Sequence, residues 1–84
     1  MEEAAAWYER EAGMGDRFFT AVNLAKSFVR RHPQLGTPHR RGTRKWPVKG
    51  FPYLVIYRDE PDRVFIISVA HGNREPGFWE NRLV

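Results

Sequence analysis

The stretch from Phe51 to Gly72, FPYLVIYRDEPDRVFIISVAHG, decides the fold of this chain. It holds two runs rich in β-branched and aromatic residues, Tyr53–Tyr57 and Val64–Ala70. Between them lies the polar sequence Asp59-Glu60-Pro61-Asp62, which is typical of a turn. The pattern therefore predicts two antiparallel strands joined as a β-hairpin.

Alternation along these strands predicts two different faces if Arg58 lies opposite Arg63. One face is wholly apolar and is expected to pack against helices; it carries Leu54, Ile56, Phe65, Ile67 and Val69. The other is amphipathic and is expected to be an open working surface; it carries Tyr53, Val55, Tyr57, Val64, Ile66 and Ser68. Residues 44–49 alternate loosely and contain Pro47, which suits an edge strand.

The first half of the chain has a helical period instead. Residues 2–12, EEAAAWYEREA, favour a helix by composition, and Gly13-Met14-Gly15 breaks it. Asp16 is the expected N-cap of a second helix, which Pro33 ends. That helix has an apolar stripe made of Phe18, Ala21, Val22, Ala25, Phe28 and Val29. The sequence thus predicts one α+β domain over residues 1–84, with a helical hairpin on one face of a small antiparallel sheet.

The composition excludes several classes of protein. There is no cysteine, so disulfides and thiolate metal sites are excluded. The histidines His32, His39 and His71 are scattered, and neither a metal site nor a cofactor is predicted. No apolar run reaches the roughly 18 residues that span a bilayer, and a cytoplasmic location is expected.

The net charge of +4 comes from residues 37–50, TPHRRGTRKWPVKG, which hold five basic residues and no acid. Such a stretch is either a solvated loop or a surface that attracts a polyanion or an acidic partner.

The strings FPYLVIYR and VAHGNREPGFW, after two helices, resemble the RelE/ParE superfamily of toxins from bacterial type II toxin–antitoxin modules. The resemblance implies a small α+β toxin that a cognate antitoxin neutralises by wrapping an extended segment around it. Members of the superfamily usually begin with a β-strand, whereas this sequence starts at the first helix, so either its start was assigned too late or the strand is absent. If the strand is absent, we expect one sheet edge to be unpaired. We also expect an acidic antitoxin peptide to cover residues 37–50 or the nearby sheet.

Within this superfamily we expect a RelE-type toxin, a metal-independent, ribosome-dependent endonuclease of mRNA that arrests translation, because the basic segment Arg44–Lys49, His71 and Arg74 favour RNA. This resemblance implies Arg74 as a catalytic candidate, because it falls where the RelE pattern has a basic residue. The second catalytic candidate is His71, proposed on chemical grounds because imidazole suits a proton shuttle. RelE has a tyrosine near the place of Phe78 and Trp79, so that hydroxyl is missing. The candidates for contact with RNA or with a partner are Arg44, Lys45, Lys49, Tyr53 and Arg58.

Two other interpretations remain open. A ParE-like toxin would inhibit DNA gyrase without cleaving anything, and the PGFW ending with the missing hydroxyl favours it. The other interpretation is that the chain is an inactive remnant of such a toxin. In either case His71 is an ordinary residue at a strand end or an interface contact, and Arg74 either contacts the partner or pairs with Glu75.

Overall fold

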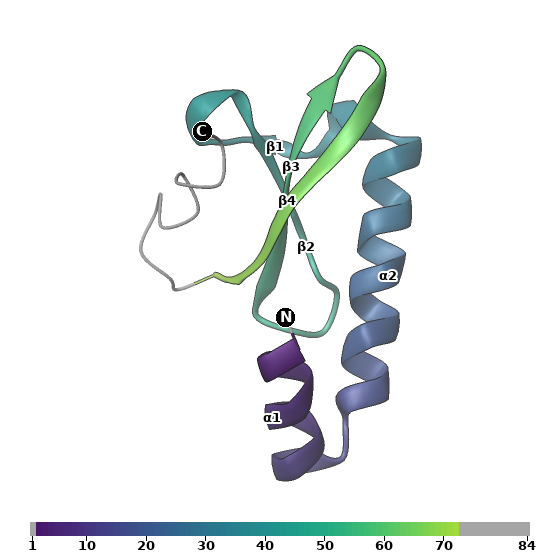
Figure 1. Ribbon diagram of the computed structural model, residues 1–84, viewed down its shortest axis with the longest axis vertical. Coiled ribbons are helices and arrows are strands. Elements are labelled where there is room, and N and C mark those ends of the chain that lie inside the picture. Colours follow the sequence, from purple (N-terminus) through teal and green to yellow (C-terminus); the bar gives the residue numbers. More distant parts are fainter. Residues whose placement is uncertain (1, 73–84) are drawn as a thin grey trace.

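The structure, a computed structural model, describes residues 2–72 of the chain (Figure 1). Its helices are α1 (Glu2–Ala12) and α2 (Gly15–Arg31), and its strands are β1 (Thr37–Pro38), β2 (Arg44–Pro47), β3 (Tyr53–Glu60) and β4 (Arg63–His71). Two short 3-10 turns, η1 (Pro33–Leu35) and η2 (Arg40–Gly42), flank β1. The predictions made for Arg74, Phe78 and Trp79 fall outside the described residues.

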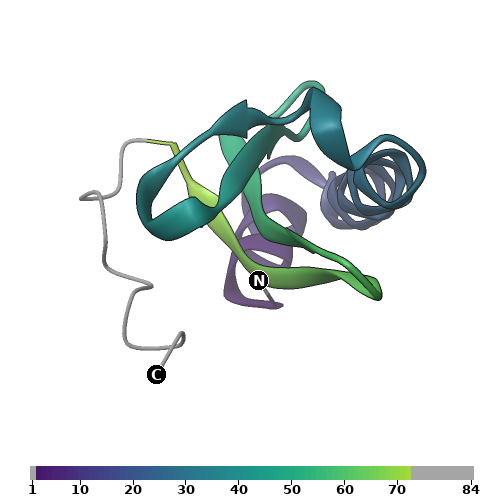
Figure 2. The ribbon, with the colours of Figure 1, turned by 90° about the horizontal axis from the view of Figure 1, so that it is seen from above.

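The strands form one antiparallel sheet in the order β1-β2-β3-β4. The two helices form an antiparallel hairpin in which α2 runs along the sheet and α1 lies at one end of it (Figure 1). Seen from above, α2 lies to one side of the twisted sheet (Figure 2). The predicted α+β fold, with a helical hairpin packed on an antiparallel sheet, is confirmed.

One core joins both helices to the sheet. It contains Ala5 from α1, Phe18 and Val22 from α2, and Val55 and Tyr57 from β3, all of them buried. Four members of the predicted stripe of α2 form its core face, namely Phe18, Val22, Ala25 and Val29. The other two, Ala21 and Phe28, are only partly buried. Burying such side chains supplies most of the stability of a small domain.

The break between the helices differs in detail from the prediction. Asp16 is not the N-cap, because α2 begins at Gly15 and Met14 occupies the cap position without a side-chain hydrogen bond. The carboxylate of Glu9 accepts the Gly15 N–H at 3.0 Å instead. A Cβ at residue 15 would lie 3.1 Å from the carbonyl oxygen of Ala5, so glycine allows the two helices to approach closely.

The prediction of which sheet face meets the helices was wrong. The helices pack on the face that carries Tyr53, Val55 and Tyr57, whereas Ile56 forms a small second cluster with Ile67 and Ala70 on the opposite face. The physical reason is that a buried tyrosine is well accommodated when its hydroxyl is hydrogen-bonded. The presence of Tyr53 and Tyr57 on one face was therefore not a sign that this face is exposed to solvent.

The predicted register was also wrong. Glu60 lies opposite Arg63 and Arg58 lies opposite Phe65, because the connecting turn is only Pro61-Asp62. A bulge then changes the pairing between Ile56 and Tyr57, so that Val69 lies opposite Val55. The extra residue in β4 moves Val69 to the helix-covered face.

The β1 side of the sheet is only partly closed. β1 has two residues, and it pairs with Arg44 and Lys45. Within the described residues, no strand pairs with the outer edge of β2 at Trp46 and Pro47, which agrees with the edge character predicted for this segment. At the other side, within the part of the chain that the structure describes, the sheet ends at β4.

Among the described residues no helix has the length and apolarity that a membrane span requires.

Candidate functional site

The candidate proton-transfer residue His71 pairs across the hairpin with Tyr53. Their rings contact edge to face, with centroids 5.2 Å apart. Tyr53 also contacts Phe18 at 5.1 Å and Tyr8 at 6.3 Å, so the pair lies at the edge of the aromatic core, on the helix-covered face. Burial, and then the nearby Tyr53, raise the pKa of Tyr8 above its ordinary value.

Arg44 supports the backbone of the neighbouring segment. Its guanidinium donates hydrogen bonds to the carbonyl oxygens of Gly36 at 2.8 Å and Gln34 at 3.3 Å. Next to it, the hydroxyl of Tyr57 accepts the Gly36 N–H at 3.0 Å and donates to the Pro33 carbonyl at 2.7 Å. Arg44 and Tyr57 together therefore attach residues 33–36 to the sheet.

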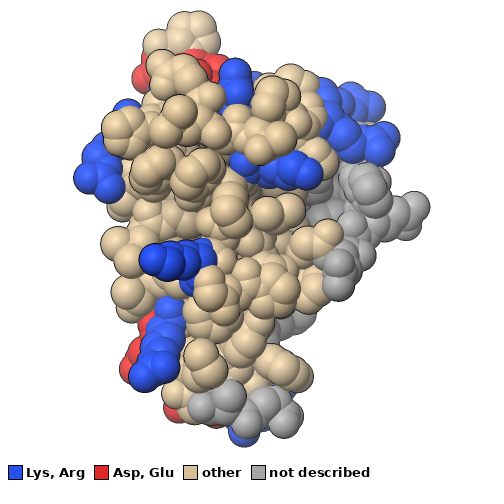
Figure 3. Space-filling model, turned by 180° about the vertical axis from the view of Figure 1, so that it is seen from behind, with Lys and Arg blue, Asp and Glu red and all other residues tan. Residues whose placement is uncertain are grey.

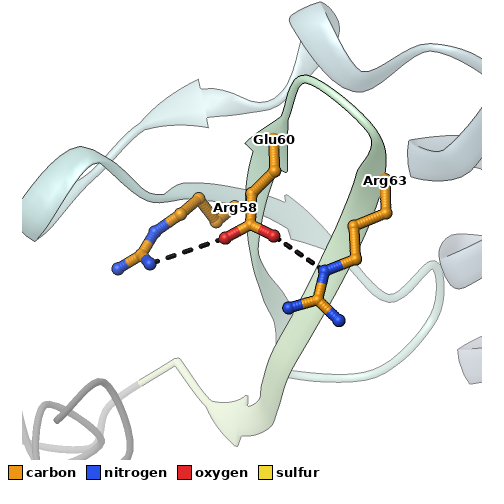
Figure 4. Close-up of polar contacts among 3 residues, drawn as sticks. All are labelled: Arg58, Glu60 and Arg63. Carbon is orange, nitrogen blue, oxygen red and sulfur yellow. Dashed lines mark hydrogen bonds and ion pairs between the residues drawn. The ribbon is translucent and has the colours of Figure 1, made fainter.

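Lys45 and Arg58 lie on the opposite sheet face, because Lys45 pairs with Ile56 and Arg58 with Phe65. At the hairpin end, Glu60 lies between Arg58, at 3.7 Å, and Arg63, at 2.8 Å (Figure 4). With Asp59 and Asp62 included, residues 58–63 hold three acids and two arginines. This end of the sheet is therefore not a basic surface, although it contains two arginines.

The sheet thus separates the predicted site residues. His71 and Tyr53 are on the helix-covered face, and Lys45 and Arg58 are on the other. Lys49 is exposed in the loop after β2, and Arg74 is outside the described residues. Arg44 pairs with Tyr57 and so lies on the face of His71, but its guanidinium is hydrogen-bonded to the carbonyl oxygens of Gln34 and Gly36. Lys45 and Arg58 lie across the sheet from His71.

A groove of about 560 Å³ lies between α2 and the β2 side of the sheet. Phe28 and Trp46 stack in it, with ring centroids 4.4 Å apart and planes inclined by 15°. Leu24, which is 65% exposed, and Phe51 also line it. Its charged lining residues are Asp16, Arg17 and Lys49. The result is an apolar surface with a net positive border, on the partly open side of the sheet.

The sequence prediction missed this groove, although α2 contains a signal for it. Ala21, Leu24 and Phe28 recur at helical spacing beside the buried stripe, so the apolar surface of α2 is wider than its core face requires. The stacking of Phe28 on Trp46 was not predictable, because it joins two elements far apart in the chain.

Within the described residues, no group of three or more histidine or acidic side chains is placed to hold a metal ion.

The family model described as ParE toxin of type II toxin–antitoxin system, parDE, matches residues 1–76. No curated protein and no solved structure shows a significant match.

Proposed function

The chain belongs to the ParE toxin family of type II toxin–antitoxin systems, and we propose that it arrests growth in the cytoplasm by binding and inhibiting DNA gyrase. Membership of this family implies a cognate antitoxin as a partner. The proposal makes the protein a binding inhibitor and not an enzyme.

The separation of the candidate residues by the sheet supports this proposal. Cleavage of RNA through its 2′-hydroxyl needs a base, an acid and cations around one phosphate. Here His71 packs beside Tyr53 on the helix-covered face, while Lys45 and Arg58 project from the other face. A binding inhibitor does not need these groups to converge.

The second candidate function is the metal-independent, ribosome-dependent cleavage of mRNA. One observation favours it, because His71 and Tyr53 place two groups capable of proton transfer side by side. In this case Arg74 would neutralise the charge of the scissile phosphate, and replacing it would raise the barrier by about 2–4 kcal/mol, as for a lost oxyanion donor.

The antitoxin binds in the groove between α2 and β2 under this proposal. The stacked rings of Phe28 and Trp46, with the exposed Leu24, favour apolar side chains of a partner segment. Arg17 and Lys49 at the border favour acidic residues beside them. The groove adjoins the basic stretch 37–50, where the charge of the sequence also predicts an acidic partner.

The experiment that separates the two functions induces the toxin in cells and follows DNA replication and protein synthesis. Gyrase inhibition predicts that replication stops first, and that cellular RNA is equally intact with the wild type and with His71→Ala. Cleavage of mRNA predicts that translation stops first, and that His71→Ala and Arg74→Ala abolish the arrest. Circular dichroism confirms in both cases that the variants are folded.

A further inference from the structure

The turn between β1 and β2 presents two arginines on a rigid and strained backbone. Arg40 and Arg41, in η2, are exposed. Arg41 has φ 55° and ψ 39°, in the left-handed region, and among the described residues it is the non-glycine residue with a positive φ. This conformation is costly for a side chain that has a Cβ, and glycine or asparagine is the usual residue in it.

The turn is held closed at its base. The His39 N–H donates to the Thr43 carbonyl at 2.8 Å, and the Thr43 N–H donates to the Arg40 carbonyl at 3.1 Å. The Thr43 hydroxyl donates to the same Arg40 oxygen, and Thr43 is buried. A Cβ at Gly42 would meet nothing within 4 Å, so the end of the turn projects from the molecule. The backbone thus fixes the position from which the two arginines extend.

The segment that carries the turn has a positive charge. Residues 37–50 contain no acid, and basic side chains gather at the upper right of Figure 3, the region that holds this turn at the upper left of Figure 1. Burial, followed by the charges of Lys45 and Arg40, lowers the pKa of His39 below its ordinary value. An anion that approaches the turn is therefore attracted by several charges at once.

Folding does not require arginine at residue 41, since glycine adopts this conformation at lower cost. Strain that is kept at an exposed charged residue points to a role of its side chain. The guanidinium group binds phosphate through two parallel hydrogen bonds, and a fixed pair of arginines suits a polymer of phosphates.

We propose that the η2 turn binds the phosphate backbone of duplex DNA through Arg40 and Arg41, and so contacts the DNA that gyrase holds. This inference rests on the proposed function. It gives the toxin a second contact beside the one with gyrase itself. An antitoxin seated in the groove, with acidic residues toward β1 and β2, would then shield the turn as well.

The test uses the full chain and a short fluorescent DNA duplex of arbitrary sequence. Arg41→Gly removes one charge and relieves the strain, so its melting temperature should equal or exceed that of the wild type. Its affinity for the duplex should fall on the order of fivefold, and the slope of log K against log salt should lose about 0.9 for each lost phosphate contact. Arg41→Asn, which also tolerates the left-handed backbone, is the second variant.

The matched control is Arg30→Ala, which removes the same charge from an exposed position at the end of α2. It should leave both the affinity and the salt slope near the wild-type values. If Arg30→Ala weakens binding as much as Arg41→Gly does, the effect is one of net charge and the turn is not a site.

Further measurements distinguish DNA from RNA as the ligand, and distinguish a contact with DNA from a contact with the antitoxin. Single-stranded RNA of the same sequence should bind more weakly than the duplex, and tighter binding to RNA would overturn the assignment to DNA. Inhibition of supercoiling by Arg41→Gly should need on the order of fivefold more toxin. If the wild type inhibits gyrase and Arg41→Gly inhibits equally well, the inference is wrong while the proposed function stands.

If Arg41→Gly weakens only the antitoxin complex, the turn is an antitoxin contact and the inference about DNA is wrong. If the wild type does not inhibit gyrase at all, the proposed function fails, whatever the duplex measurement shows.

Discussion

Replacement of Tyr57 by phenylalanine tests the packing that attaches residues 33–36 to the sheet. The Tyr57 side chain is fully buried, and its hydroxyl makes two hydrogen bonds, with the Gly36 N–H at 3.0 Å and the Pro33 carbonyl at 2.7 Å. Tyr57→Phe keeps the ring and removes both bonds. It leaves the N–H of the buried Gly36 without this acceptor.

The expected loss is about 2–3 kcal/mol of unfolding free energy, since an unsatisfied buried group costs about 1–3 kcal/mol. A domain of 84 residues has a total stability of about 4–13 kcal/mol, so the loss is a large fraction of it. The melting temperature should fall by about 10–20 °C, at about 4–8 °C for each kcal/mol.

The measurement is thermal unfolding followed by circular dichroism, with Tyr53→Phe as the control. Tyr53 is only partly buried, so its variant should lose less than about 0.5 kcal/mol. If the melting temperature of Tyr57→Phe falls no more than that of Tyr53→Phe, the hydroxyl does not attach the segment and this reasoning is refuted.

Three further predictions follow from the same contacts. Gly36→Ala should be destabilised by more than about 2 kcal/mol in a urea titration, because its Cβ would overlap the Tyr57 hydroxyl; wild-type stability would contradict this. Burial raises the pKa of Tyr57 above the ordinary 10.0, so the contribution of its hydroxyl to the free energy of unfolding is complete below pH 10.0 and is lost as the pH rises through the folded pKa. Tyr57→Phe should therefore lose less stability than the wild type at alkaline pH. Identical pH profiles of stability for the two proteins would contradict the raised pKa. Leu24→Glu places a charge in the groove at a position that is 65% exposed, so the fold should persist while antitoxin affinity falls at least about tenfold by titration calorimetry; Asn23→Glu, exposed on the same helix outside the groove lining, should bind normally.

The helices and the hairpin were predictable because their signals are local. The predicted helix over residues 2–12 coincides with α1, and Gly13-Met14-Gly15 breaks the chain where expected. The strand runs around Pro61-Asp62 became β3 and β4, each a few residues longer than predicted. Short-range patterns of this kind need no knowledge of the partner element.

The orientation of the sheet was not predictable from local pattern. The partners of the Tyr57 hydroxyl lie 21 and 24 residues away along the chain, and only they explain why the tyrosine face is buried. The bulge near Ile56 has no clear mark in the sequence, yet it moves Val69 to the other face. The same change put His71 beside Tyr53 and away from Lys45, which the sequence alone could not indicate.

The most direct test of the central claim mixes the purified toxin with DNA gyrase, relaxed plasmid and ATP, and measures supercoiling as the toxin is titrated. In parallel, the same toxin is added to ribosomes that are translating a defined mRNA. The account predicts that supercoiling is lost in proportion to the toxin, that the antitoxin restores it, and that the mRNA stays intact. Full supercoiling in the presence of excess folded toxin, together with cleaved mRNA, would contradict it.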